Sequence, residues 1–118
     1  MKYESIEVKP LTPTIGAVIG GVDLTRPLSN VEVEELHIAL ADHLVIFFRD
    51  QKIDHESHKR FGRYFGELYI HSASKPIEGH KEIIRIHADE NSNHIAGDMW
   101  HSDLSCDPAP PLGGRVWR

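Results

Sequence analysis

The chain has 118 residues, of which 40% are hydrophobic and 26% charged, and its formal net charge is −5. This length is typical of one small domain, and this composition is typical of a globular protein rather than a disordered one. The acidic balance argues against a nucleic-acid-binding protein, and the longest apolar run, residues 44–48, is too short to cross a membrane.

The cysteine content and the N-terminus both indicate the cytoplasm. The single cysteine, Cys106, cannot form a disulfide within the chain, which fits a reducing compartment. Residues 1–10 contain charges but no apolar segment of the kind found in secretory signals. We therefore expect a cytoplasmic protein without a membrane span.

The first third of the chain predicts two strands and a helix. Residues 5–9 alternate polar and apolar side chains, which is the period of a half-buried strand. Residues 15–24 combine β-branched residues with glycine, which predicts a strand with a Gly-Gly kink or bulge. Ser29 and Glu32 have the spacing of a capping box, so we expect a helix from there to about His43.

This helix should bury one stripe of side chains and expose the opposite face. The expected apolar stripe consists of Val33, Leu36 and Leu40, with Leu44 as a further candidate. Its solvent-exposed face is expected to carry Glu32, Glu34, Glu35 and His37. The continuous apolar run at residues 44–48 then predicts a strand that is buried on both faces.

Asp54 is a candidate N-cap for a second helix over residues 55–65, which Gly66 would end. Its expected buried face consists of Phe61, Tyr64 and Phe65. The sequence HESH at residues 55–58 is one residue short of the zinc-protease motif, so we interpret it as an exposed first turn.

The second half of the chain is predicted to contain short strands and long connections. Strands are expected at residues 67–71 and 83–86, a loop at 72–81, a long connection at 87–99 and a turn-rich stretch at 107–114. The whole pattern predicts an α+β fold that is mainly β, in a single domain over residues 1–118.

His101 and Asp103 are the residues that most suggest chemistry. On a strand, residues two apart point to the same face, so this imidazole and carboxylate would project together. They would form two thirds of the facial triad, two histidines and one carboxylate, that holds Fe(II) with three coordination positions open. The alternative is a histidine that is hydrogen-bonded to a nearby aspartate in a loop.

Several segments along the chain together resemble one enzyme family. They are IGA at 15–17 with GVDL at 21–24, RPLS at 26–29, VIFFRDQ at 45–51, RYFGEL at 63–68 with IH at 70–71, WHSD at 100–103 and PP at 110–111. In this order they resemble the N-terminal part of the TauD/TfdA family, the iron(II)- and 2-oxoglutarate-dependent dioxygenases that include taurine dioxygenase.

The resemblance implies a double-stranded β-helix (jelly roll) with flanking helices, incomplete in this chain. It implies that His101 and Asp103 are iron ligands and that 2-oxoglutarate is the co-substrate. The implied reaction couples decarboxylation of 2-oxoglutarate by O₂, to succinate and CO₂, with hydroxylation of a small anionic substrate. The homo-oligomers common in the family are a further expectation.

By the same resemblance, His71 matches a position that contacts the anionic group of the substrate. Two other polar contacts of the taurine branch are missing, because Ser72-Ala73-Ser74 and Gly97 stand where that branch has a tyrosine and an asparagine. We therefore expect a different sulfonate, an alkyl sulfate or a carboxylate as the substrate, rather than taurine. Trp100 is expected to pack beside the metal, and Cys106 to have no ligand role.

The family's third ligand, a distal histidine, and its 2-oxoglutarate-binding arginine have no counterpart among these residues. The sequence therefore predicts a truncated chain with negligible dioxygenase activity on its own. The alternatives are an inactive remnant, an interaction module or one half of a split enzyme. A small zinc protein would need further ligands near His101, for which His87 and His94 are the nearby candidates.

Overall fold

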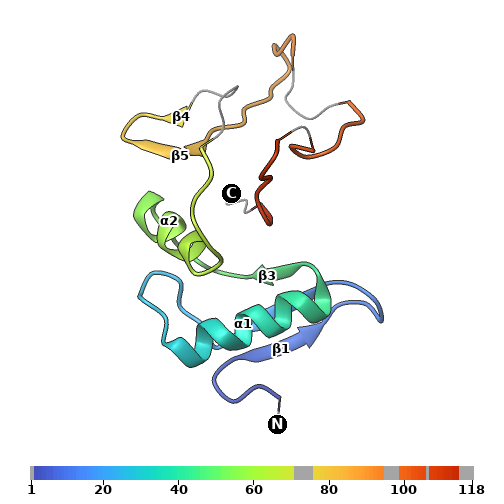
Figure 1. Cartoon of the computed structure of the whole chain (residues 1–118), viewed down its shortest axis with the longest axis vertical. Helices are drawn as coiled ribbons and strands as arrows, with labels where there is room; N and C mark the ends of the chain where they lie inside the picture. The colour runs from blue at the N-terminus through green and yellow to red at the C-terminus, as the bar shows by residue number, and fades with distance from the viewer. Residues whose placement is uncertain (1, 71–75, 95–98, 106, 115–118) are drawn as a thin grey trace. The chain divides into compact units, whose positions relative to one another are not determined.

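The computed structural model describes residues 2–70, 76–94, 99–105 and 107–114. The chain divides into two compact units, Met1–Gly66 and Glu67–Arg118 (Figure 1). None of the helices in the described ranges is long and apolar enough to span a membrane.

The N-terminal unit contains a three-stranded sheet and two helices. Its strands are β1 (Glu7–Pro10), β2 (Ala17–Gly20) and β3 (Ile46–Phe48), and its helices are α1 (Asn30–His43) and α2 (His55–Arg63). The sheet order is β1-β2-β3, with β2 antiparallel to β1 and parallel to β3. The parallel pair requires a crossover connection, which α1 supplies.

The core of this unit lies between β2 and α1. Ala17 and Ile19 of β2 are buried, in alternation with half-buried neighbours, and Leu36 and Ala39 of α1 are fully buried. Other buried members of the core are Ile6, Val22, Leu24 and Ile53. The expected stripe on α1 is confirmed at Leu36, whereas Val33 and Leu40 are only half-buried.

The predicted capping box of α1 is confirmed. The Ser29 hydroxyl accepts from the Glu32 amide at 3.2 Å, and the Glu32 carboxylate accepts from the Ser29 amide at 2.7 Å. The helix ends at His43 as expected, and Leu44 follows it with φ +67°. This left-handed residue lets the chain turn from the helix into β3.

The prediction that Glu35 lies on the exposed face of α1 is wrong. Glu35 is buried, and its carboxylate accepts from the backbone amides of Glu4, Ser5 and Ile6 and from the Ser5 hydroxyl. These donors would otherwise be unpaired at the start of the chain, so the carboxylate ties the N-terminal segment to the helix.

The prediction that residues 44–48 form a strand buried on both faces is also wrong. Only Ile46–Phe48 is a strand, and β3 lies at the edge of the sheet. Ile46 and Phe48 pack against the core, while Leu44, Val45 and Phe47 are exposed. An edge strand with one covered face leaves alternate side chains in solvent, even where all of them are apolar.

The start of α2 is as predicted, with the Asp54 side chain accepting from the Ser57 amide at 2.7 Å. The helix ends at Arg63, and Gly66, at φ +131°, follows it. Phe61 and Phe65 are half-buried against the core and stack edge to face, with ring centroids 5.4 Å apart. The Tyr64 hydroxyl accepts from the Leu28 amide.

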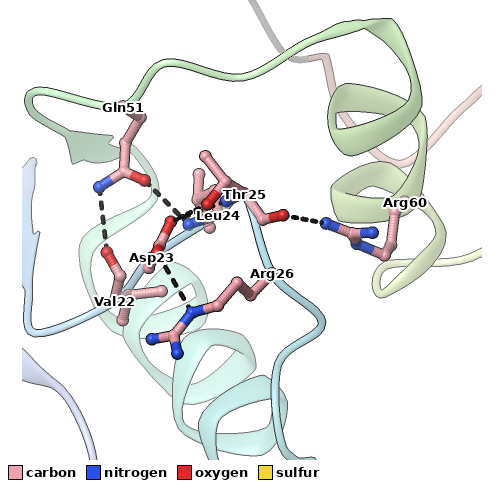
Figure 2. A network of polar contacts seen from close by, with 7 residues as sticks. All are labelled: Val22, Asp23, Leu24, Thr25, Arg26, Gln51 and Arg60. Atoms are coloured by element: carbon pink, nitrogen blue, oxygen red, sulfur yellow. Dashed lines mark hydrogen bonds and ion pairs between the residues drawn. The ribbon is translucent and has the colours of Figure 1, made fainter.

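The Gln51 side chain forms hydrogen bonds with the backbone of residues 22–24, as a neighbouring strand would. Its Oε1 accepts from the Leu24 amide at 2.9 Å, and its Nε2 donates to the Val22 carbonyl at 3.0 Å. Figure 2 shows this bridge, together with the Arg60 guanidinium that donates to the Thr25 carbonyl at 2.9 Å. Val22 and Leu24 are buried, so their backbone groups have little access to water.

Replacing Gln51 with leucine should therefore lower the free energy of unfolding by about 1–3 kcal/mol, because buried backbone groups lose their partners. The isosteric Gln51→Glu should also destabilise the protein, since a carboxylate oxygen then faces the Val22 carbonyl. Urea denaturation measures both effects. The exposed neighbour supplies the control, Lys52→Leu, and equal stability of all three variants would contradict this role.

The C-terminal unit contains one small hairpin. Strands β4 (Pro76–Ile77) and β5 (His80–Ile84) pair antiparallel, and Gly79, at φ +78°, forms the turn between them. The predicted loop at 72–81 is therefore wrong from Pro76 onward, because a two-residue strand leaves almost no pattern in the sequence. The strand predicted at 67–71 is absent over residues 67–70.

The described residues confirm an α+β fold with two short sheets and two helices. The expected excess of β structure is not found among them, because the two helices contain more residues than the five strands together.

Candidate functional site

His101 and Asp103 lie in a loop and not on a strand. No helix or strand occurs over the described residues 99–105, so the period-two argument for their common direction does not hold. The two side chains nevertheless meet, with His101 Nε2 3.2 Å from Asp103 Oδ1. A histidine paired with a nearby aspartate in a loop is the arrangement named above as the alternative, so the metal-binding role of the two residues stays a prediction.

The other ring nitrogen of His101 is engaged by the backbone. Nδ1 lies 2.6 Å from the Met99 carbonyl oxygen, to which an Nδ1–H donates. Because a carbonyl oxygen can only accept, Nδ1 keeps its hydrogen, and carbonyl partners orient metal-binding histidines in this way. The contact of Nε2 with the Asp103 carboxylate requires an Nε2–H in the metal-free protein, so Nε2 would have to lose that hydrogen to bind a metal ion. The Met99 carbonyl and, to a smaller extent, the Asp103 carboxylate raise the pKa of His101.

The separation of Nε2 and Oδ1 suits two ligands of one metal ion. Ligand atoms about 2.1 Å from an octahedral ion and at right angles to each other lie about 3 Å apart. The imidazole and carboxylate donor set matches the facial triad, and both side chains are accessible, with 54% and 93% of their surface exposed. These residues therefore fit an iron ion as two of its three protein ligands.

Within the described ranges, no group of three or more His, Cys, Asp or Glu side chains could hold a metal ion. His94 is described but does not join His101 in such a group. The described residues offer a pair of ligands and not a complete site.

A second histidine–aspartate pair with the same spacing provides a comparison. His87 Nε2 lies 3.0 Å from Asp89 Oδ2. The other carboxylate oxygen of Asp89 accepts from the Asn91 amide and from the Ser92 hydroxyl, so this aspartate organises a turn. His87–Asp89 is thus a turn-forming pair, whereas His101 has the backbone contact that orients a ligand.

The loop that follows His101 is held together by its own hydrogen bonds. The Ser102 and Ser105 hydroxyls pair with each other, and the Asp107 amide donates to the Leu104 carbonyl at 3.0 Å. The Asp107 carboxylate accepts from the Tyr69 hydroxyl at 2.7 Å. The sequence did not indicate roles for Tyr69 or Asp107, because no motif links an aspartate in a turn to a tyrosine 38 residues earlier.

Trp100 is fully exposed, and Met99 is also largely exposed, so the predicted packing of Trp100 is not seen. His71, the predicted substrate-binding residue, lies outside the described residues, as do Gly97 and Cys106. Their predicted roles stay predictions.

Comparison with known proteins gives the context of this site. Residues 7–114 match the family described as "Taurine catabolism dioxygenase TauD, TfdA family". The chain is 31% identical over 107 residues to an alpha-ketoglutarate-dependent sulfate ester dioxygenase of Pseudomonas putida, covering 90% of this chain and 35% of that protein. It is 32% identical over 117 residues to an alpha-ketoglutarate-dependent sulfonate dioxygenase of Saccharomyces cerevisiae, covering 90% of this chain and 28% of that protein.

Solved structures give the same result. A taurine dioxygenase from Burkholderia xenovorans is 44% identical, with a TM-score of 0.62 over 66% of this chain and 28% of that chain. AAD-2 in complex with Mn(II) and N-oxalylglycine is 30% identical, with a TM-score of 0.52 over 53% of this chain and 25% of that chain. The chain thus spans about a third of the length of the curated relatives that it matches. Because the family match extends over nearly all of its residues, this chain belongs to the TauD/TfdA family of iron(II)- and 2-oxoglutarate-dependent dioxygenases.

Proposed function

We propose that this chain contributes His101 and Asp103 as two of three Fe(II) ligands to a dioxygenase that hydroxylates a small anionic substrate. The observation that carries the proposal is the family match over residues 7–114, within which both residues lie, and their 3.2 Å contact is compatible with two ligands of one ion. The Met99 carbonyl on Nδ1 supports it, because that contact leaves Nε2 as the ligand atom. A relative of known structure in complex with Mn(II) and N-oxalylglycine supports a metal and a dicarboxylate co-substrate.

Each residue has a defined task in this proposal. Bound Fe(II) would supply the coupling of 2-oxoglutarate decarboxylation by O₂ to hydroxylation of the substrate. The neutral imidazole of His101 serves as a borderline ligand, and the Asp103 carboxylate offsets part of the charge of the cation. Met99 holds the imidazole in the tautomer that exposes Nε2.

The remaining parts of the site are proposed to come from sequence outside the matched residues 7–114. These parts are the second histidine ligand and the arginine that pairs with 2-oxoglutarate. We propose that residues 1–118 form the N-terminal part of one jelly-roll catalytic domain, for which the cytoplasm stays the expected compartment. The aligned part of this chain covers only 35% and 28% of the two relatives, which supports this proposal.

The proposed substrate is a sulfonate, an alkyl sulfate or a carboxylate. The matched relatives are a sulfate ester dioxygenase, a sulfonate dioxygenase and an alkylsulfatase. His71 is proposed to contact the anionic group of the substrate. Taurine is disfavoured because Ser72-Ala73-Ser74 and Gly97 stand where the taurine branch has a tyrosine and an asparagine.

The test supplies the complete protein with Fe(II), 2-oxoglutarate and O₂ and measures succinate, with taurine, an alkyl sulfate, another sulfonate and a phenoxy acid offered in turn. We expect substrate-dependent succinate, with at least one of the other anions preferred to taurine. Residues 1–118 are assayed alone as a separate arm, and we expect negligible turnover there. Absence of succinate formation by the complete protein with every anion would contradict the proposal and favour a remnant or an interaction module.

A further inference from the structure

The metal-binding pair is held by a loop whose geometry depends on side-chain hydrogen bonds. The described residues 99–105 and 107–114 contain no helix or strand, so no sheet ladder fixes the positions of His101 and Asp103. Leu104, directly after Asp103, has φ +52°, a left-handed conformation that is costly for leucine. Such a conformation persists only where surrounding contacts impose it.

Asp107 is at the centre of these contacts. Its amide donates to the Leu104 carbonyl at 3.0 Å, which closes the turn that contains the strained residue. Its Oδ1 accepts from the Ala109 amide at 3.0 Å, and its Oδ2 accepts from the Tyr69 hydroxyl at 2.7 Å. The Asp107 amide therefore holds the residues before it, and its half-buried carboxylate holds Ala109 after it and Tyr69.

Tyr69 anchors this loop from outside. Among the hydrogen bonds and ion pairs between described residues, the Tyr69–Asp107 bond is the one that joins residues 99–114 to another segment. The Tyr69 hydroxyl and then the Ala109 amide lower the pKa of Asp107, so the acceptor is ionised at neutral pH. Hydrogen bonds to an ionised carboxylate are the stronger kind.

We propose that Tyr69 and Asp107 are positioning residues for the metal-binding pair His101 and Asp103. Their hydrogen bond holds Asp107 in place, the Asp107 amide closes the turn at Leu104, and this turn sets the direction of the Asp103 carboxylate relative to the imidazole. This inference rests on the proposed function.

The test compares Tyr69→Phe, Asp107→Ala and the double variant in the complete protein. Hydrogen exchange without metal reports on the loop, and we expect the amides of Asp107 and Ala109 to exchange faster in each variant. Titration with Co(II) reports on the ligand pair. We expect about 3- to 10-fold weaker binding, the effect of one hydrogen bond, together with a changed ligand-field spectrum. The double variant should bind no more weakly than Asp107→Ala, because the two residues act through one contact.

Tyr3→Phe is the matched control. Its hydroxyl also lies within hydrogen-bonding distance of an aspartate, 3.4 Å from Asp42 Oδ2, but in the N-terminal unit. We expect unchanged Co(II) affinity and spectrum in this variant.

Each outcome has one meaning. Faster exchange with unchanged Co(II) affinity and spectrum would overturn the positioning role and leave the hydrogen bond only a structural one. Unchanged exchange would overturn the role of the bond in the loop. If the unaltered protein binds Co(II) but His101→Ala binds it equally well, the proposed metal site itself is wrong, and the inference fails with it.

Discussion

Replacing His101 with alanine should reduce Fe(II)-dependent succinate formation by the complete protein by more than about 100-fold. Loss of a hydrogen-bond partner that orients a metal ligand costs about 10–100-fold in metal affinity or activity, and loss of the ligand itself should cost more. His101 has the features that a ligand requires, namely an accessible Nε2 close to a carboxylate and an Nδ1 held by the Met99 carbonyl.

The chain offers a matched control for this experiment. His87 and Asp89 have the same spacing and nearly the same contact, 3.0 Å, but they lack a role in the proposed site. His87→Ala should therefore leave both metal affinity and turnover within about twofold of the unaltered protein. Equal losses in the two histidine variants would contradict the assignment of His101, because a general effect of removing an imidazole would then explain both.

The parts of the fold that depend on local sequence signals were predictable. The capping box at Ser29 and Glu32 and the N-cap at Asp54 are contacts between residues three positions apart, so spacing alone identifies them. The helix α1 therefore begins and ends where the sequence predicts. The position of Leu36 in the core follows from the same periodicity.

The errors arose where distant residues decide the outcome. Glu35 is buried because the N-terminal segment supplies donors from 29 to 31 positions away, and no local pattern reports this. Strand β3 is exposed on one face because it lies at the edge of the sheet, which a run of apolar residues does not reveal. The hairpin of β4 and β5 is too short to produce a periodic pattern.

The sequence selects candidate site residues but does not predict their local geometry. The order of several family segments selected His101 and Asp103 from nine histidines and many carboxylates, and their role as metal ligands stays a prediction. Their contact was expected from a strand, yet it arises from a loop held by Met99, Leu104 and Asp107. Hydrogen bonds from side chains to loop backbone have no period in the sequence, so only the structure brings Tyr69 and Asp107 into the account.

Replacing Glu35 with glutamine should lower the thermal unfolding midpoint at neutral pH by roughly 5–10 °C. The carboxylate accepts from the amides of Glu4, Ser5 and Ile6 with its two oxygens. Glutamine retains one acceptor oxygen and turns an NH₂ group toward the remaining donors. Differential scanning calorimetry as a function of pH measures the change.

The pH dependence has a defined sign. The Glu4 amide, followed by the Ser5 hydroxyl and the Ser5 and Ile6 amides, lowers the pKa of Glu35 from its ordinary value of 4.5. The unfolded chain therefore binds more protons than the folded protein once the pH approaches that value. The stability that Glu35 contributes is complete above about pH 4.5 and is lost as the pH falls through the lowered folded-state pKa. Glutamine cannot titrate, so the midpoints of the variant and the unaltered protein should converge in acid.

The variant Glu34→Gln distinguishes the loss of the Glu35 hydrogen bonds from the loss of one negative charge. Glu34 lies on the exposed face of α1, and Glu34→Gln removes the same charge one position away. We expect this variant to retain both the neutral-pH midpoint and the acid dependence of the unaltered protein. If Glu34→Gln and Glu35→Gln shifted the midpoint equally, net charge and not the tie between α1 and the N-terminal segment would explain the result.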